Sequence, residues 1–469
     1  MSDILEVAPR REALCRAESE PAPVVRLSEL IGALSFALDL TEGQPPGHSL
    51  RCCWIGTEIG RRLGLSPVRL AELYYTLLLK DAGCSSNAAR LWQLYGGDDR
   101  TVKRNVKTVD LQSRAQILRF LLRNTGIGEG AGSRLRRLLH IVRNGEALAQ
   151  EVVTARCERG AQIATRMGFG EQVAHGVQSL DEHWNGCGRP TGLAGTAIPL
   201  AARIGLLAQV IDVFHAIGGR RAALKEIDRR AGTWFDPTLV MLFREMARDG
   251  RVWEGLTAQG LEARVAAREP VPISWTVDET RLDAITGAFA DVVDAKSSFT
   301  AGHSRRVAAL TDTIAKRLGF SAERRRWLTR AAHLHDLGKL GVSNAILDKP
   351  GRLDTAEWAE IRRHPALSEE ILGHVGVFHE LAPIAGAHHE RLDGKGYPKG
   401  LAGEAIALET RVLTTADIFD AITAARPYRS AVPVGEALGM MERDRGTAVD
   451  ERCLDALHAV VGSTPGLTG

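Results

Sequence analysis

The chain has 469 residues, too many for one compact core, and this length favours two or three domains. Its 60 lysines and arginines nearly balance 57 aspartates and glutamates, whereas an obligate nucleic-acid binder needs a strong basic excess. The seven cysteines are scattered, odd in number and form no CxxC motif, which favours a reducing compartment over a disulfide framework.

Residues 1–26 are charged, contain proline and alanine and show no apolar periodicity, so we expect a flexible N-terminal segment. The segment lacks the apolar core of a signal peptide. No uninterrupted apolar stretch in the chain approaches 18 residues, the length that suggests a membrane span. The sequence therefore predicts a cytoplasmic protein without a membrane partner.

From Leu27 onward, apolar residues recur at intervals of three and four, the spacing of amphipathic helices. This periodicity predicts helices within the ranges 29–40, 55–65, 71–83, 115–124 and 133–142. No segment shows a sustained alternating pattern typical of strands. The expected fold class is all-α.

An internal repeat divides the chain. GHSLRCCWIGTEIGRRLGLS (47–66) parallels GHSRRVAALTDTIAKRLGFS (302–321), and LDEHWNGCGRPTGLAGTAI (180–198) parallels HHERLDGKGYPKGLAGEAI (388–406). KDAG and HDLG follow the first pair of segments at the same interval. Such self-similarity indicates two copies of one domain.

The repeat predicts two tandem helical domains, at 27–260 and 280–462, with a linker at 261–279 and a tail at 463–469. The first copy is longer by a basic insertion at about 93–145, whose cations we interpret as solvated helix faces. No zinc finger, aromatic platform or phosphate-binding glycine loop accompanies them, so we expect no nucleic-acid partner. These basic residues are Lys103, Arg104, Lys107, Arg114, Arg119, Arg123, Arg134, Arg136, Arg137 and Arg143.

The second copy carries five histidines and two aspartates on separate helical segments, more ligands than one tetrahedral ion needs. One carboxylate in such a set can bridge two ions, and two ions a few Å apart clamp the attacking and leaving oxygens of phosphoester hydrolysis. The pattern therefore predicts a dinuclear phosphodiesterase site. Its candidate ligands are His303, His335, Asp336, His364, His388, His389 and Asp417.

The dipeptide His335-Asp336 and the tripeptide Gly396-Tyr397-Pro398 make residues 280–462 resemble the HD-GYP subgroup of the HD phosphohydrolases. The resemblance implies hydrolysis of cyclic di-GMP to pGpG, GMP or both. It also implies two divalent transition-metal ions, iron or manganese, with zinc or nickel as alternatives.

The resemblance assigns the seven residues above as metal ligands, with Asp336 bridging the ions and Asp336 and Lys339 acting in catalysis. Lys339, Tyr397, Arg426 and Arg429 match positions that contact the substrate. Some family members hold a third metal with a glutamate where this chain has Phe299, so we expect two metals. Asp420, one helical turn after Asp417, is placed to orient a ligand.

The first copy has lost this chemistry, since only His48 and Asp81 remain of the seven ligands. We expect Lys80 and Arg156 to place cations where the second copy has metals. The first copy is then a scaffold, a ligand sensor or a surface for homodimerisation. The changed positions are Lys80, Cys84, Arg156, Leu180, Asp181, Arg189 and Gln209.

Two alternatives remain for the whole chain. It could be an HD phosphohydrolase acting on another cyclic dinucleotide or nucleotide, although the intact GYP string counts against that. It could also be a non-catalytic, cyclic-dinucleotide-binding scaffold, although the complete ligand set of the second copy counts against that.

Overall fold

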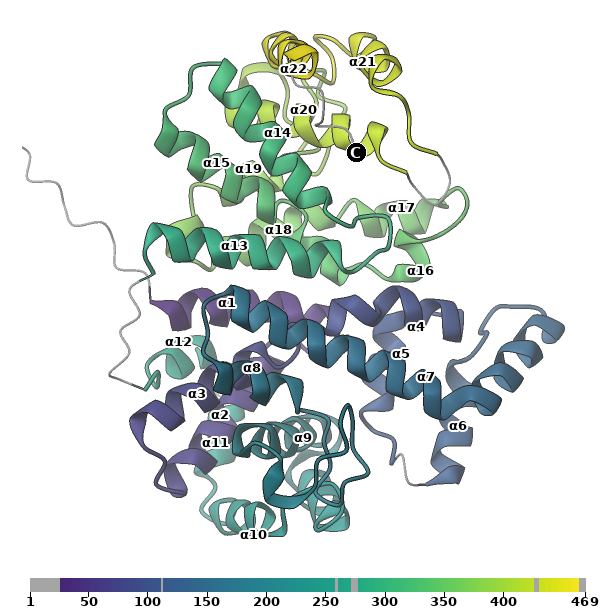
Figure 1. The fold of residues 1–469 in the computed structure, drawn as a ribbon, viewed down its shortest axis with the longest axis vertical. Helices are drawn as coiled ribbons and strands as arrows, with labels where there is room; N and C mark the ends of the chain where they lie inside the picture. Colours follow the sequence, from purple (N-terminus) through teal and green to yellow (C-terminus); the bar gives the residue numbers. More distant parts are fainter. Residues whose placement is uncertain (1–25, 111–112, 258–259, 271–276, 426–429, 464–469) are drawn as a thin grey trace, which may run out of the picture.

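The computed structural model describes residues 26–110, 113–257, 260–270, 277–425 and 430–463. These residues are mainly helical and include no β-strand, only two isolated bridges, which confirms the expected all-α class. The helices form two lobes, with α1–α12 in one and α13–α22 in the other (Figure 1). The expected flexible segment, apart from Arg26, and the tail beyond Ser463 lie outside the described residues.

The first lobe contains the first copy and its insertion. Its elements are α1 (Leu27–Thr41), α2 (His48–Arg62), α3 (Pro67–Leu79), η1 (Cys84–Asn87), α4 (Ala88–Tyr95), α5 (Asp99–Val106), α6 (Arg114–Asn124), α7 (Ala131–Arg166), α8 (Glu171–Gln178), η2 (Gly195–Ala197), α9 (Leu200–Arg230), α10 (Pro237–Met246), α11 (Arg251–Thr257) and α12 (Leu261–Ala266).

The second lobe contains the second copy. Its elements are α13 (Glu279–Asp294), α14 (His303–Arg317), α15 (Ala322–Leu334), η3 (Leu337–Gly341), α16 (Asn344–Leu347), α17 (Thr355–Ile361), α18 (His364–Gly373), η4 (Gly376–Phe378), α19 (Ala382–Gly386), η5 (Gly403–Ala405), α20 (Leu408–Thr423), α21 (Val434–Glu442) and α22 (Glu451–Ser463).

The predicted repeat is visible in the local structure. Gly47 and Gly302 both have a left-handed backbone, with φ of 81° and 71°, and each precedes a helix that begins with a histidine. Glycine adopts this conformation without steric cost. The next helix in each copy is capped by a serine, Ser66 or Ser321, whose side chain accepts a backbone N–H.

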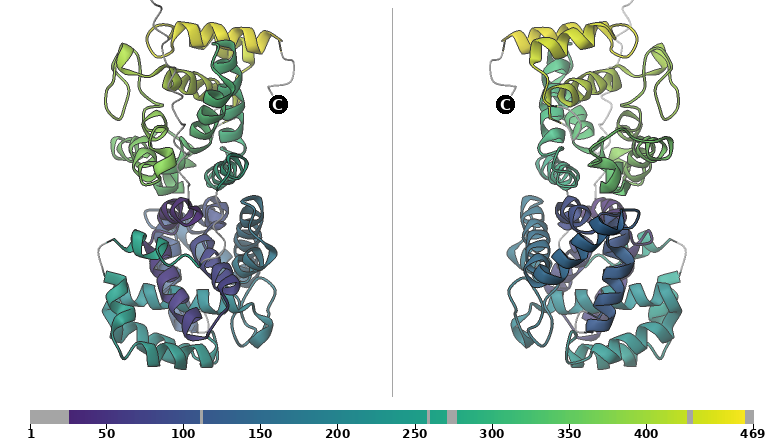
Figure 2. Two further views of the ribbon diagram at one scale, coloured as in Figure 1. Left: turned by 90° about the vertical axis from the view of Figure 1, so that its left-hand side faces the viewer. Right: turned by 90° about the vertical axis from the view of Figure 1, so that its right-hand side faces the viewer.

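The two lobes share one hydrophobic core. Buried apolar side chains form a cluster that extends through both copies. Helix α1 packs against η3 and α18 of the second lobe, and α7 packs against α13. In the side views, helices of the first lobe (purple to blue) face those of the second lobe (green) across this boundary (Figure 2).

The structure adds to one expectation about the first copy and corrects another. The predicted linker begins with a helix, α12, which packs against α1 and α2 of the first copy. The insertion is not only a solvated face, because Lys103 is 4% exposed and the side chain of Lys107 is 7% exposed. Both cations are buried because carboxylates and carbonyl oxygens surround them.

Helix α9 is long and apolar enough to cross a membrane, judged by length and composition alone. However, 61% of its most apolar window is buried against other helices. Non-helical backbone at Gly218 and Gly219 also interrupts it. These features are typical of a core helix.

Candidate metal centre

The structure brings together all seven predicted ligands. His303 begins α14, His335 and Asp336 join α15 to η3, and His364 begins α18. His388 and His389 follow α19, and Asp417 lies within α20. All are buried except His389, which is partly exposed.

The two carboxylate oxygens of Asp336 face different pairs of histidines. Oδ2 lies 3.5 Å from His303 Nε2 and 3.4 Å from His335 Nε2. Oδ1 lies 3.2 Å from His364 Nε2 and 3.7 Å from His388 Nε2. Asp336 therefore stands between two groups of nitrogen donors, as a bridging carboxylate would.

Each group of donors is completed by one further residue. Asp417 Oδ1 lies 3.3 Å from His303 Nε2 and 3.9 Å from His335 Nε2. His389 joins His364 and His388 in a second group whose donor atoms lie within 4.8 Å of one another. Two adjacent divalent transition-metal ions would suit such a mixed set of imidazole and carboxylate donors.

Backbone contacts fix the orientation of three rings. The Nδ1 atoms of His335, His364 and His388 lie 2.7, 2.7 and 2.5 Å from the carbonyl oxygens of Ala332, Ile361 and Ala385. An Nδ1–H that donates to a carbonyl leaves the lone pair of Nε2 free, and Nε2 is the atom that faces Asp336. The contacts of these three histidines are therefore compatible with the tautomer that a metal ligand requires.

The centre contains polar atoms without hydrogen-bond partners. His303 Nε2, His335 Nε2 and Asp336 Oδ1 are buried and accept or donate no hydrogen bond within the described residues. Leaving a buried polar atom unpaired costs about 1–3 kcal/mol. Cations bound between these atoms would satisfy them, so the donor set fits divalent metals.

The electrostatics favour neutral imidazoles around the Asp336 Oδ1 side. Burial and the neighbouring imidazoles hold the pKa of His388 well below 6.5, and burial lowers the pKa of His389 to about 3. Burial opposes a charge on His303 as well, but the nearby carboxylates of Asp336, Asp417 and Asp420 outweigh it and raise the pKa of His303. Metal binding would release that proton.

Asp420 lies behind His303. Its Oδ2 is 2.7 Å from His303 Nδ1, and Arg306 Nε donates to its Oδ1 at 2.6 Å. The carboxylate is itself fixed by the arginine, so it can hold the imidazole in one orientation.

The predicted substrate residues are only partly described. Lys339 Nζ lies 2.6 Å from Asp336 Oδ2, and the ring of Tyr397 lies 4.8 Å from that of His389. Arg426 and Arg429 lie outside the described residues. The sequence analysis missed Arg362, whose guanidinium lies 4.9 Å from the Tyr397 ring. No motif marked it, because it comes from a separate helix end.

Glu390 shapes the GYP loop. Its carboxylate accepts the backbone N–H groups of Lys399, Gly400 and Leu401 at 2.6–3.1 Å. In the first copy, Glu182 accepts the N–H groups of Thr191 and Gly192 in the same way. The loop conformation is therefore retained in the copy that has lost its ligands.

The corresponding region of the first copy holds lysines. Lys80 pairs with Asp81, and Lys107 Nζ lies 2.7 Å from Glu42 Oε2 and 3.9 Å from Asp81 Oδ1. Lys107 comes from the insertion and was not predicted for this position. Burial raises the pKa of Glu42, but Lys107 outweighs it and the pKa falls to about 2.

Arg156 also pairs in this region, with Asp181, the repeat equivalent of His389.

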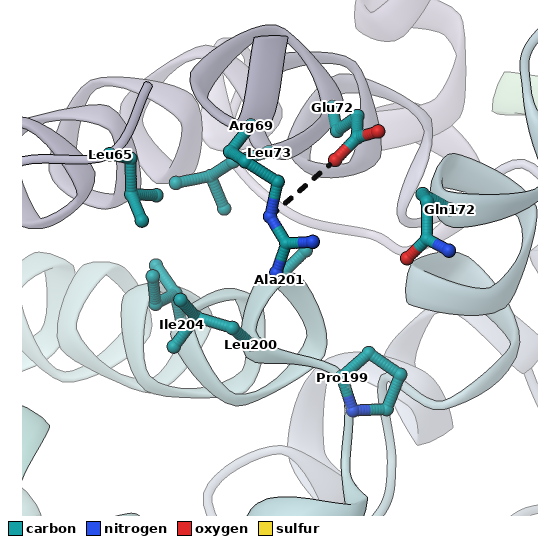
Figure 3. Close-up of a pocket in the computed structure, with 9 residues that line it drawn as sticks. All are labelled: Leu65, Arg69, Glu72, Leu73, Gln172, Pro199, Leu200, Ala201 and Ile204. Carbon is teal, nitrogen blue, oxygen red and sulfur yellow. Dashed lines mark ion pairs between the residues drawn. The ribbon is translucent and has the colours of Figure 1, made fainter. Parts of the chain in front are cut away.

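A hollow of about 70 Å³ lies between α3 and α9, near the start of α8 (Figure 3). Leu65, Arg69, Leu73 and Ile204 are among its lining residues, and none of the seven candidate ligands lines it. It has room for only a few water molecules.

Comparisons with known proteins identify the family of this chain. A family model described as the HD domain matches residues 136–239 and 287–453. "3'3'-cGAMP-specific phosphodiesterase 3" of Vibrio cholerae is 51% identical over 439 residues, which cover 94% of this chain and 95% of the relative. "Cyclic di-GMP phosphodiesterase response regulator RpfG" of Xanthomonas campestris pv. campestris is 41% identical over 170 residues, or 36% of this chain and 45% of that protein.

Among solved structures, the crystal structure of the cyclic GMP-AMP-specific phosphodiesterase V-cGAP3 of V. cholerae has a TM-score of 0.64 to this chain. It is 46% identical and covers 95% of this chain and 100% of its own. The helical fold, the dipeptide His335-Asp336 and the match to the HD-domain family model together define an HD-domain phosphohydrolase. More narrowly, the chain belongs to the HD-GYP family and is a phosphodiesterase.

Proposed function

We propose that the second copy hydrolyses a cyclic dinucleotide at a centre of two divalent ions. The observation that carries this proposal is the position of Asp336, whose two oxygens face separate pairs of histidines at 3.2–3.7 Å. His303, His335 and Asp417 would hold one ion, and His364, His388 and His389 the other, with Asp336 shared. Phe299 has no ligand atom, which supports two ions over three.

Bound at this centre, the ions would activate water at neutral pH and neutralise the charge of the phosphodiester. Donors of imidazole and carboxylate type suit iron, manganese, zinc or nickel, and the family resemblance favours iron or manganese. The chain's own contribution is to hold the donors in place and to present Lys339. Its ammonium, beside Asp336, would stabilise negative charge that develops on the phosphate.

The substrate we favour is 3'3'-cGAMP. The support is the 51% identity to a relative with that printed specificity, which extends over both copies. Cyclic di-GMP, the substrate first expected from the HD-GYP strings, is the second candidate, supported by relatives that match 170 residues or similar lengths. In either case we propose hydrolysis to a linear dinucleotide, with or without further cleavage to mononucleotides.

Tyr397 and Arg362 are the described residues beside the centre that can contact a base. A guanidinium stacked on a phenol ring forms a flat, cationic surface suited to a purine. We propose that Arg426 and Arg429 hold the second phosphate or a guanine edge through paired hydrogen bonds.

The experiment is a comparison of kcat/KM for 3'3'-cGAMP, cyclic di-GMP and cyclic di-AMP with protein loaded with manganese or iron. Preference for 3'3'-cGAMP by tenfold or more is the expected result. Preference for cyclic di-GMP would favour the second candidate. Hydrolysis of none of the three, by protein that carries two metals per chain, would refute the proposed function.

We further propose that the domains span 27–260 and 280–462 and that the enzyme is cytoplasmic.

A homodimer through the first copy is also proposed. Its support is a set of large apolar side chains that α6 and α7 expose, Leu118, Leu122, Leu135, Leu139 and Val142, each 48–64% exposed. Light scattering of the wild type and of Leu139→Glu tests it, and a monomeric wild type would refute it.

A further inference from the structure

The first lobe contains a cavity of about 900 Å³, here named the insertion cavity. Its walls come from α4, α5, α6, α7 and α9 and from the loop at 181–189. Its volume is in the range typical of small-molecule sites. Arg189 and Gln209, which line it, are the repeat equivalents of Tyr397 and Asp417. The cavity thus occupies the place that the catalytic centre has in the other copy.

One wall of the insertion cavity is apolar. Leu91, Val102, Phe120, Leu121 and Ile141 line it and form a small hydrophobic cluster separate from the main core. The insertion, absent from the second copy, supplies most of this wall. Such a surface suits an alkyl or aryl group, and the sugar–phosphate ring of a cyclic dinucleotide would gain little from it.

The other wall has buried polar atoms without partners. Trp234 Nε1, His183 Nδ1 and Asn87 Oδ1 make no hydrogen bond within the described residues, and each residue is more than nine-tenths buried. His183 and Trp234 stack, with ring centroids 4.1 Å apart. All three residues line the cavity. An indole N–H is only a donor, so this wall calls for a ligand with an acceptor.

The charges of the lining select an anionic acceptor. Lys103, Lys107, Arg156 and Arg189 are the four lining cations, whereas Glu42, Glu146 and Asp181 are the three lining carboxylates. Lys107, Arg156 and Arg189 each pair with one of these carboxylates. The fourth cation, Lys103, lies 3.8 Å from Asp99, which also pairs with Lys296, so one positive charge remains in excess. One excess charge matches one carboxylate better than two phosphates.

Helix α5 connects the insertion cavity to the catalytic copy. Val102, Val106 and Lys107, on or next to this two-turn helix, line the cavity. At its other end, Asp99 accepts Lys296 Nζ at 3.1 Å and the N–H of Asn344 at 2.8 Å, both from the second copy.

The residue after Asp99 extends this connection. Arg100 donates to the carbonyl oxygen of Gly341, and its Nη2 donates to Glu360 at 3.0 Å. Gly341 ends η3, the five-residue segment that carries Lys339 and follows Asp336. A shift of α5 would therefore reach the segment beside the metal ligands.

We propose that the first copy is a receptor domain whose insertion cavity binds a small monocarboxylic acid with an alkyl or aryl body. The carboxylate accepts from Trp234 Nε1, and the apolar body packs against the wall formed by the insertion. Occupancy shifts α5 and changes the rate of phosphodiester hydrolysis in the second copy.

The test uses the full-length, metal-loaded protein. The fluorescent acid cis-parinaric acid is titrated in, and dodecanoate, dodecanol and 3'3'-cGAMP compete for it. We expect saturable binding of one probe per chain, displacement by dodecanoate and at least tenfold weaker displacement by dodecanol. Displacement by 3'3'-cGAMP in place of dodecanoate would overturn the ligand class, and absence of saturable binding would overturn the site.

Two variants and a control locate the site. Val152→Trp, on α7, fills the cavity and should abolish probe binding, whereas Ala155→Trp, exposed on the same helix, should leave it unchanged. Trp234→Phe keeps the ring but removes the N–H, and should weaken dodecanoate binding about tenfold. If Val152→Trp does not fold, equal affinity of wild type and Trp234→Phe would still refute the proposed contact.

Coupling is measured as the hydrolysis rate with and without saturating dodecanoate, kept below its micelle concentration. We expect at least a twofold change in the wild type and none in Asp99→Asn, which weakens the link between the lobes but lies outside the catalytic centre. An unchanged wild-type rate would refute the coupling even if the acid binds.

Discussion

Asp420 holds His303 through a contact of 2.7 Å between Oδ2 and Nδ1. The first copy keeps the same arrangement, since Asp212 Oδ2 lies 2.6 Å from His48 Nδ1. In both copies an arginine, Arg306 or Arg51, donates to the other oxygen of the aspartate. The contact therefore joins α14 to α20 in the second copy and α2 to α9 in the first. Only in the second copy does the histidine also face the other candidate metal ligands.

Replacing Asp420 by asparagine should weaken metal binding about 10- to 100-fold, the usual effect of removing a carboxylate behind a ligating histidine. The protein should keep its helical circular-dichroism signal. Metal affinity is measured by competition with a chelator of known strength. Asp212→Asn is the matched control and should leave metal affinity unchanged. Equal loss in both variants would show a structural effect and no role in orienting a ligand.

Removing Asp336 should abolish hydrolysis and lower metal content, because the residue is shared by both groups of donors. The matching variant in the first copy is Lys80→Met. It leaves the buried carboxylate of Asp81, the repeat equivalent of Asp336, without its nearest cation. That change should cost roughly 3 kcal/mol in free energy of unfolding, with turnover within about twofold of the wild type. Denaturant titration and kinetics measure the two effects. If Lys80→Met lost activity as fully as Asp336→Ala, the proposed division of labour would be wrong.

The convergence of the seven candidate ligands could be predicted from the sequence because their order, their spacing and their flanking glycines match the HD-GYP motifs. Gly338 illustrates the reason. A Cβ at this position would overlap the carbonyl oxygen of His364, and one at Gly83 would overlap that of Arg156. The glycine of HDLG and of KDAG is required by the same close approach of two segments.

The contacts of the insertion could not be predicted in this way. Lys107 and Asp99 lie on a short, strongly charged helix, which in isolation is indistinguishable from a solvated one. Their partners are distant in sequence, and Asp99 and Lys296 are 197 positions apart. Only the packing of the insertion against both copies shows that these charges are buried.

The buried His183 should make stability depend on pH. Burial lowers its pKa to about 4, against about 6.5 in the unfolded chain. As the pH falls below 6.5, the unfolded state binds a proton that the folded state does not. The contribution of neutral His183 to the free energy of unfolding is therefore complete above pH 6.5 and is lost progressively as the pH falls to 4. Between pH 7 and pH 5 this residue should cost the wild type roughly 2 kcal/mol.

His183→Phe retains a ring beside Trp234 and cannot bind a proton. The free energy of unfolding of this variant should fall less between pH 7 and pH 5 than that of the wild type, by the amount given above. Urea denaturation at both pH values measures it. Parallel pH profiles of the two proteins would show that His183 does not titrate as inferred from its burial.

Lys339 should act on the substrate and not on the metals. Its ammonium lies 2.6 Å from Asp336 Oδ2, and its side chain is 18% exposed, so it can reach both the centre and an incoming phosphate. Lys339→Met removes one charged donor from the developing negative charge and should lower kcat by about 100-fold, the usual effect of losing such a donor. Metal content should be unchanged or higher, because a cation that competes for Asp336 is removed. Lys316→Met, exposed on α14, is the control and should match the wild type in both measurements. Loss of metal from Lys339→Met would instead make this lysine a support of the metal centre.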